Sequence, residues 1–221
     1  MGLEEGAIVL IRLSSQRIGR HESFGFTLVE LMVTVTLLAI LMMLSAPSMM
    51  EWVRNSKVRA VSEALQNGLR EAQSESLRRS RQVVFALTDS KPTADSSAFT
   101  AKTDGNHWTV RALPSMAGES SEFVSSGILT DVGAGVTITG PAVVCFNSVG
   151  RLVPNTTSAF STLTGGATCS VDAATPPIFD IQLDGADRPL RVLVALGGQV
   201  RMCDPKKTMS NAHPDGCPAS S

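Results

Sequence analysis

The feature that most constrains this chain is a long apolar run close to its N-terminus, residues 26–46. The run has 21 residues, and because an α-helix rises about 1.5 Å per residue it can cross the roughly 30 Å hydrocarbon core of a bilayer. One carboxylate, Glu30, lies inside it. A charge in hydrocarbon is costly unless it is paired or hydrated. The sequence therefore predicts one membrane-spanning helix whose Glu30 needs a partner.

The segment before the run, residues 1–25, is polar up to the edge of the run and ends at Gly25. An ordinary secretory signal has a small-residue cleavage site after its apolar region, and no Ala-x-Ala site follows this one. Basic residues flank the run on both sides, with Arg20 before it and Arg54 after it. The positive-inside rule therefore does not settle the orientation.

The segment 25–31, Gly-Phe-Thr-Leu-Val-Glu-Leu, resembles the prepilin peptidase site of type IV pilins and type II secretion pseudopilins. The resemblance implies that the peptidase cuts after Gly25 and methylates the new amine of Phe26. It further implies that Glu30 recruits and registers the subunit by facing the Phe26 amine of a neighbour. Pro47 lies 47 − 25 = 22 residues into the mature chain, where these families commonly have a helix-kinking proline.

The same resemblance places the leader in the cytoplasm and the C-terminal domain in the periplasm, with a single pass through the bacterial inner membrane. It implies three kinds of partner: the prepilin peptidase, other minor and major pilins or pseudopilins, and the inner-membrane assembly platform. The alternative interpretation is an unprocessed single-span anchor in which Glu30 is incidental.

The four cysteines all lie beyond the apolar run, and their even number suits an oxidising compartment such as the periplasm. No pair has the CxxC spacing of zinc or thioredoxin-type sites. Of the three possible pairings we favour Cys145 with Cys169 and Cys203 with Cys217, because each closes a loop rich in Gly, Pro, Ser and Thr.

An amphipathic helix is predicted from Trp52 to about Gln82, continuing the membrane helix. Its apolar residues recur at three- and four-residue steps: Val58, Val61, Leu65, Leu69 and Ala72. We expect this stripe to pack on a sheet. Near the helix C-terminus, cations complement the helix dipole, so Arg78, Arg79 and Arg81 are expected to be solvated caps or, alternatively, a binding site for a partner.

Beyond residue 82 the pattern changes to short apolar runs separated by Gly, Pro, Asn and Ser, which is typical of strands and turns. Strands are predicted at 83–87, 107–113, 136–139, 142–146, 178–183, 190–196 and 199–202, with a two-residue hairpin turn at Gly197-Gly198. Residues 89–106 and 154–177 are expected to be loops. The fold class is thus α+β, a type IV pilin fold with four segments: leader 1–25, membrane helix 26–46, helix continuation 47–82 and antiparallel β domain 83–221.

Three segments of the β domain resemble the GspH/FimT/FimU group of minor pilins and minor pseudopilins. They are Val-Val-Phe at 83–85, Cys-Phe-Asn-Ser-Val-Gly-Arg at 145–151, and Gly-Gln-Val-Arg-Met-Cys-Asp-Pro at 198–205. This resemblance implies a minor pilin that primes or supports pilus assembly at the filament tip, in twitching, adhesion or DNA uptake. The alternative is a GspH-like minor pseudopilin of a type II secretion system.

Catalytic chemistry is not indicated. His21, His107 and His213 lack metal-ligand spacing to one another or to cysteine, and no phosphate loop, GxSxG or HExxH motif is present. Asp180, Asp184 and Asp187 surround a turn without the pattern of a calcium loop. We therefore expect no enzyme activity, no metal and no cofactor.

A basic cluster near the C-terminus is the one candidate ligand site. The β domain has 9 Lys and Arg against 12 Asp and Glu, but between residues 188 and 207 five cations face only Asp204, for a local charge of 5 − 1 = +4. The cations are Arg188, Arg191, Arg201, Lys206 and Lys207. FimT-type pilins of some competent bacteria bind DNA through a Gly-Arg-x-Arg element in this region, and cations can take DNA phosphates without reading sequence. Here Gln199 replaces the first Arg of that element. The alternatives are a solvated hairpin or an interface with another minor pilin.

Overall fold

The computed structural model describes residues 25–93, 98–116, 118–172 and 175–219. It divides into two compact units, one ending at Leu44 and one formed by residues 45–221, and each is described by itself. The predicted leader, residues 1–25, lies outside the described residues except for Gly25. The domain boundaries given above stay predictions.

Helix α1 runs from Leu28 to Arg79, and its assignment is continuous through residue 47. Within the second unit it buries the predicted apolar stripe, since Val58, Val61, Leu65, Leu69 and Ala72 are at most 1% exposed. This prediction is confirmed. The helix ends three residues earlier than expected because Ser80 takes a left-handed conformation, with φ of 51°, and the Arg81 amide donates to the Ser76 carbonyl oxygen at 3.2 Å. This pattern is a Schellman cap.

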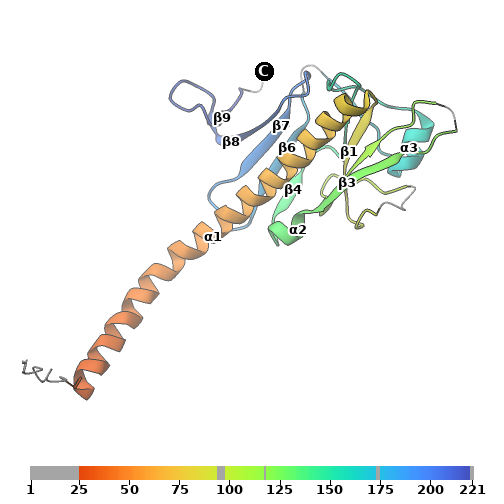
Figure 1. The fold of residues 1–221 in the computed structure, drawn as a ribbon. Coiled ribbons are helices and arrows are strands. Elements are labelled where there is room, and N and C mark those ends of the chain that lie inside the picture. The colour runs from red at the N-terminus through yellow and green to blue at the C-terminus, as the bar shows by residue number, and fades with distance from the viewer. Residues whose placement is uncertain (1–24, 94–97, 117, 173–174, 220–221) are drawn as a thin grey trace, which may run out of the picture. The chain divides into compact units, whose positions relative to one another are not determined.

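Two sheets follow α1 in the second unit (Figure 1). The first has the strand order β3-β2-β1-β5 and is antiparallel throughout. The second has the order β4-β6-β7-β8-β9, in which only the β8–β9 pair is parallel. The strands are β1 Val83–Thr88, β2 His107–Ala112, β3 Glu122–Ile128, β4 Thr137–Thr139, β5 Val143–Phe146, β6 Ile178–Gln182, β7 Leu190–Val194, β8 Val200–Thr208 and β9 Gly216–Cys217.

The main core lies between the C-terminal part of α1 and the two sheets, with Phe85, Phe146 and Phe179 fully buried in it. Gly68 of α1 lets the helix approach this layer, because an added Cβ there would lie 3.0 Å from the Phe85 ring and 3.1 Å from the Trp108 ring. A second cluster, which includes Val84, Val143 and Phe160, covers the other face of the first sheet. Strand β1 is consequently buried at all six positions.

Several expectations were wrong in detail. Strand β3, the short helix α2 (Leu129–Val132) and the short strand β9 were not predicted, and β8 continues to Thr208 rather than ending at residue 202. Helix α3, Ser158–Thr164, lies in the segment expected to be a loop. Local capping explains α3: Thr157 accepts a hydrogen bond from the Phe160 amide at 3.3 Å, and Gly165 closes the helix with φ of 70°.

The β7–β8 hairpin also differs from its prediction. The Ala195 amide donates to the Gln199 carbonyl oxygen and the Gly198 amide to the Ala195 carbonyl oxygen. The loop therefore has three residues, 196–198, and Gly198 takes the left-handed position with φ of 88°. This is the usual three-residue hairpin with a glycine bulge rather than a two-residue turn.

Candidate functional site

Helix α1 begins directly after Thr27, which is its N-cap. The Thr27 hydroxyl accepts a hydrogen bond from the Glu30 amide at 3.2 Å, and its carbonyl oxygen accepts one from the Leu31 amide at 3.1 Å. Thr27 and Glu30 have the spacing of a capping box, a helix-start signal that sequence reasoning missed. The helix thus begins at the third residue after the predicted cleavage point.

Gly25 has no structural reason to be glycine among the described residues. An added Cβ would meet no atom within 4 Å, and Gly25 is not among the glycines with positive φ. Phe26 is 80% exposed. A requirement for glycine at this position would therefore come from outside the folded chain.

Two threonine hydroxyls in the apolar part of α1 are satisfied within the helix. The Thr34 hydroxyl donates to the Leu31 carbonyl oxygen at 2.9 Å, and the Thr36 hydroxyl donates to those of Met32 and Val33. Such back-bonding removes the cost of a bare hydroxyl in hydrocarbon. By length and composition α1 is able to cross a membrane, and its large apolar side chains between residues 26 and 44 are at least half exposed.

Among the described residues, two of the five C-terminal cations form ion pairs. Arg191 makes a bidentate contact with Asp180, directly opposite on β6, at 2.7 and 3.2 Å. The Lys207 ammonium lies 2.6 Å from an Asp215 carboxylate oxygen and 3.7 Å from one of Asp204. The hydrogen bond that Lys207 donates to Asp215 lowers the pKa of Asp215 and raises the pKa of Lys207.

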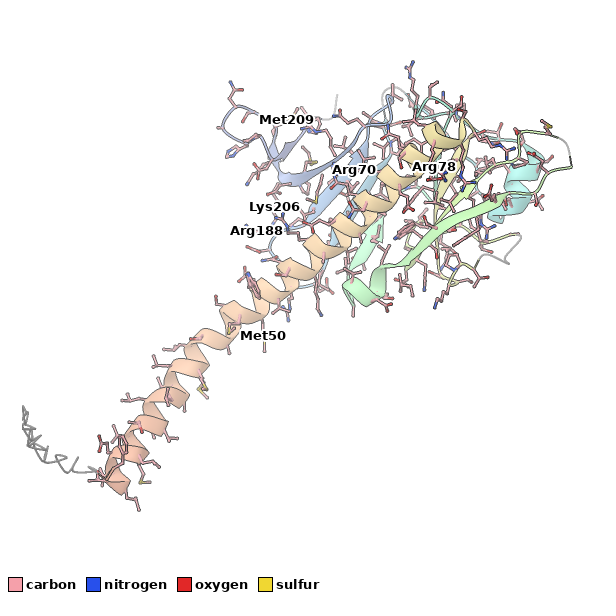
Figure 2. The ribbon with its side chains drawn as sticks, viewed as in Figure 1. Met50, Arg70, Arg78, Arg188, Lys206 and Met209 are labelled. Carbon is pink, nitrogen blue, oxygen red and sulfur yellow. A yellow bond between two sulfur atoms is a disulfide. The ribbon has the colours of Figure 1, made fainter. Side chains whose placement is uncertain are left out.

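The other three cations lie on the same part of the second unit. Lys206 contacts the Asp187 carbonyl oxygen, and Arg201 donates to the Met209 sulfur at 3.4 Å. Figure 2 shows Arg188 and Lys206 close together beside α1. The structure brings the carboxylates of Asp180 and Asp215 to these cations in addition to that of Asp204, so the cluster with its ion-paired acids has a charge of 5 − 3 = +2 rather than +4.

Of the arginines at the end of α1, Arg79 and Arg81 are tied to the domain more firmly than solvated caps, whereas the Arg78 side chain is 64% exposed. Arg78 and Arg79 both contact Glu75, at 2.6 and 2.8 Å, and Arg79 also reaches Glu122 of β3 at 2.5 Å. Arg81 pairs with a further glutamate, Glu119, at 3.1 Å. The hydrogen bond from Arg78 lowers the pKa of Glu75 to about 2, although partial burial opposes this shift.

Two of the segments that carry the narrower resemblance meet in space. An added Cβ at Gly198 would lie 1.8 Å from the Gly150 carbonyl oxygen, so the hairpin tip sits directly against the 147–151 turn. Gln73 of α1 donates to the same carbonyl oxygen at 3.1 Å. The Asn147 side chain holds the turn by accepting from the amides of Val149 and Arg151. Helix, turn and hairpin thus form one contact at the end of α1.

The disulfides are Cys145–Cys169 and Cys203–Cys217, the pairing that the sequence favoured. The first joins β5 to the segment after α3 inside the second core cluster. The second ties β9 to β8. Within the described ranges no cluster of three or more His, Cys, Asp or Glu side chains is placed to hold a metal ion. His107 starts β2, whereas His213 lies in an exposed turn; His21 lies outside the described residues.

The fold and N-terminal segment define a class: an α+β protein with a long N-terminal helix, able to cross a membrane, and two mainly antiparallel sheets. Residues 20–46 match the family model of the prokaryotic N-terminal methylation motif. The resemblance to type IV pilin-like proteins predicted from Gly25–Leu31 is therefore confirmed for this segment. No curated protein matches the sequence.

Solved structures with a similar fold include the type IV minor pilin FimU of Pseudomonas aeruginosa, at 14% identity and a TM-score of 0.44, covering 67% of this chain and 98% of FimU. The minor pseudopilin EpsH of the Vibrio cholerae type 2 secretion system has 13% identity and a TM-score of 0.41, over 69% and 99% of the two chains. E. coli GspH has 10% identity and a TM-score of 0.41, over 71% and 94%. We draw no functional conclusion from similarities this distant.

Proposed function

We propose that this chain is a non-catalytic minor pilin, cleaved between Gly25 and Phe26 and built into a type IV pilus, where it primes or supports assembly at the tip. Before assembly it is held in the bacterial inner membrane by the helix 26–46, with residues 83–221 in the periplasm. Its partners are the prepilin peptidase, other pilins and the inner-membrane assembly platform.

The observation that carries the proposal is the N-terminal segment. It matches the methylation motif over residues 20–46, and its Gly25 meets no requirement of the described fold. A peptidase that accepts only a small residue before the cleaved bond would explain why position 25 is glycine. The two disulfides support a periplasmic domain, since such bonds persist in oxidising compartments.

Replacing Gly25 with valine tests the cleavage without disturbing the domain. We expect Gly25→Val to leave the full 221-residue chain in the membrane, whereas the unchanged chain starts with methylated Phe26 when its N-terminal mass is measured. Gly197→Val is the matched control, because an added Cβ there also meets no atom within 4 Å and its φ is not positive. If the protein without substitutions kept its full leader in cells that contain an active peptidase, the proposal would be refuted.

The choice between pilus and secretion system depends on the phenotype. Deletion of the gene should reduce surface pili and twitching. Normal piliation with failed secretion of exoproteins would instead assign the chain to the minor pseudopilins of a type II secretion system.

DNA binding is the weaker alternative, because the acids that pair with the C-terminal cations reduce the charge of the cluster to +2. A DNA titration of the full-length protein in detergent, repeated with Arg188→Gln and Lys206→Gln, checks it. Binding that weakens with salt and with both substitutions would favour a receptor for transformation.

A further inference from the structure

A short stretch of α1 after the apolar run carries an exposed apolar surface, which we name the Trp52 face: Met49, Trp52 and Val53. Trp52 is 68% exposed, Met49 is 64% exposed and Val53 is 45% exposed. All three belong to the second unit, which begins at Ser45. Large apolar side chains gathered on one side of a helix need a cover other than water, so the Trp52 face indicates a contact with an apolar surface.

The Trp52 face is turned away from the core. Leu65 lies at the centre of the buried stripe of α1, and successive residues of an α-helix are about 100° apart around its axis. The three side chains therefore lie about 120–160° around the axis from Leu65. The sheets of the second unit pack on the side of α1 that Leu65 occupies, so they do not cover this face.

The side of α1 that faces the domain is polar at this level. The Asn55 side chain donates to the Asp187 carboxylate at 2.5 Å and accepts from the Arg188 amide at 3.2 Å. Arg54 donates to the Gly185 carbonyl oxygen at 3.4 Å. The loop between β6 and β7 thus holds polar side chains here and leaves the apolar ones outside. Further along α1 the arrangement is reversed, because there the apolar side faces the core.

The outward side of α1 becomes polar after Val53. Its next exposed positions are Ser56, Arg59, Glu63 and Asn67. Arg59 and Glu63 form an ion pair with each other at 2.8 Å. A change from apolar to polar residues along one side of a helix marks the level at which its surroundings become aqueous.

Chain length places this level at the edge of a bilayer. Trp52 follows Ala46, the end of the apolar run, by six residues, and α1 is continuous there, so the rise along the axis is about 9 Å. The headgroup layer extends about 5–8 Å beyond each side of the hydrocarbon core. Tryptophan is enriched at this level, because its large ring is apolar and its indole N–H is polar.

We propose that the Trp52 face lies in the headgroup layer of the membrane that holds the subunit, covered by phospholipid headgroups and the upper parts of their acyl chains. The part of α1 embedded in lipid then extends beyond the predicted end at residue 46 and reaches Val53. The inference rests on the proposed function in one respect, because it requires α1 to be inserted in a membrane.

Quenching of tryptophan fluorescence in phospholipid vesicles tests the proposal. The chain has two tryptophans, so the difference between the unchanged protein and Trp52→Phe isolates the signal of Trp52. The full-length protein is reconstituted at low density in vesicles of phosphatidylcholine and phosphatidylglycerol. We expect a spin label on the headgroup to quench the Trp52 signal about twofold more than a label at the end of the acyl chains, and iodide in the water to quench it weakly.

Asn67→Trp, combined with Trp52→Phe, is the matched control. Asn67 is exposed and follows Met49 by 67 − 49 = 18 residues, which is five full turns, so it lies on the same side of the helix about 27 Å further along the axis. Its tryptophan should be quenched by iodide and not by the headgroup label. Equal quenching of the two positions by the headgroup label would overturn the proposal.

Two further results for Trp52 would also overturn it. Strong quenching by iodide alone would mean that water covers the ring, and protection from both quenchers would mean that protein covers it. Flotation of the same vesicles separates this inference from the proposed function. A protein that floats with the vesicles while Trp52 is in water overturns this inference alone, whereas a protein that does not float overturns both.

Discussion

Replacing Gly198 with alanine tests whether the contact between the hairpin tip and the 147–151 turn stabilises the domain. Two costs add. Gly198 has φ of 88°, where a non-glycine residue costs about 1–2 kcal/mol. The new methyl group would also lie 1.8 Å from the Gly150 carbonyl oxygen, so the turn must move, and overpacking of this kind costs about 1–3 kcal/mol. We expect Gly198→Ala to lower the free energy of unfolding by about 2–5 kcal/mol.

Gly118→Ala separates the two costs. Gly118 has almost the same backbone conformation, with φ of 87°, but an added Cβ meets no atom within 4 Å. We expect it to cost only the backbone part, about 1–2 kcal/mol. The assay is guanidinium unfolding of the full-length protein in detergent, followed by tryptophan fluorescence, in which half-buried Trp108 reports on the core. Equal losses for the two variants would refute a stabilising contact between the two segments.

Three further predictions concern the same free energy of unfolding. Cys145→Ser with Cys169→Ser should cost about 3.5 kcal/mol by the chain-entropy model for a loop of about 25 residues, against about 3 kcal/mol for removal of the shorter disulfide, and chemical denaturation of both double variants checks the order. Arg111 is buried between two phenylalanine rings, each 5.7 Å away, so thermal melts should show Arg111→Ala losing about 3 kcal/mol and Arg111→Met staying near neutral. The pKa of Glu75 is lowered to about 2 from its usual 4.5, so its ionised form stabilises the fold fully above pH 4.5, and this stabilisation is lost as the pH falls towards 2. In a pH series, the free energy of unfolding should fall by about 1 kcal/mol less for Glu75→Gln than for the unchanged protein, a figure reduced for the exposure of Arg78.

Sequence reasoning was strongest where one local pattern decides the structure. The stripe from Val58 to Ala72 repeats at helical spacing, and all of it is buried. Strands rich in Val, Ile and Leu were found within a few residues of their ends. Both signals come from residues close in sequence, so they can be read without knowing what packs against them.

Strand β3 shows why other elements were missed. Its sequence, Glu-Phe-Val-Ser-Ser-Gly-Ile, is poor in strand-forming residues at its centre. The strand depends on pairing with β2, where Gly127 lies opposite Trp108. An added Cβ at Gly127 would lie 2.4 Å from the indole nitrogen, so the glycine makes room for the ring. This reason becomes visible only once the partner strand is known.

The C-terminal cations show the same limit for a candidate site. A window of 20 residues counted one acid, but Asp180 precedes the window and Asp215 follows it. Strand pairing brings Asp180 to Arg191. The Cys203–Cys217 disulfide closes the segment in which Asp215 reaches Lys207. Net charge along the chain therefore overstated the charge of the surface.

The fold does not by itself explain why a carboxylate, Glu30, stands in the apolar helix. At the third position of α1 it suits the positive end of the helix dipole, and such an effect is worth about 0.3–1 kcal/mol. Placing a carboxylate in a membrane helix costs about 2.5–3.5 kcal/mol at the centre and less near an end. The dipole effect alone would be too small to offset this cost at the centre of the bilayer, and Glu30 lies near the helix end, where the cost is lower. We expect hydration at the bilayer edge to supply the difference in the stored subunit, and an ammonium such as the Phe26 amine of a neighbour to supply it wherever water is excluded.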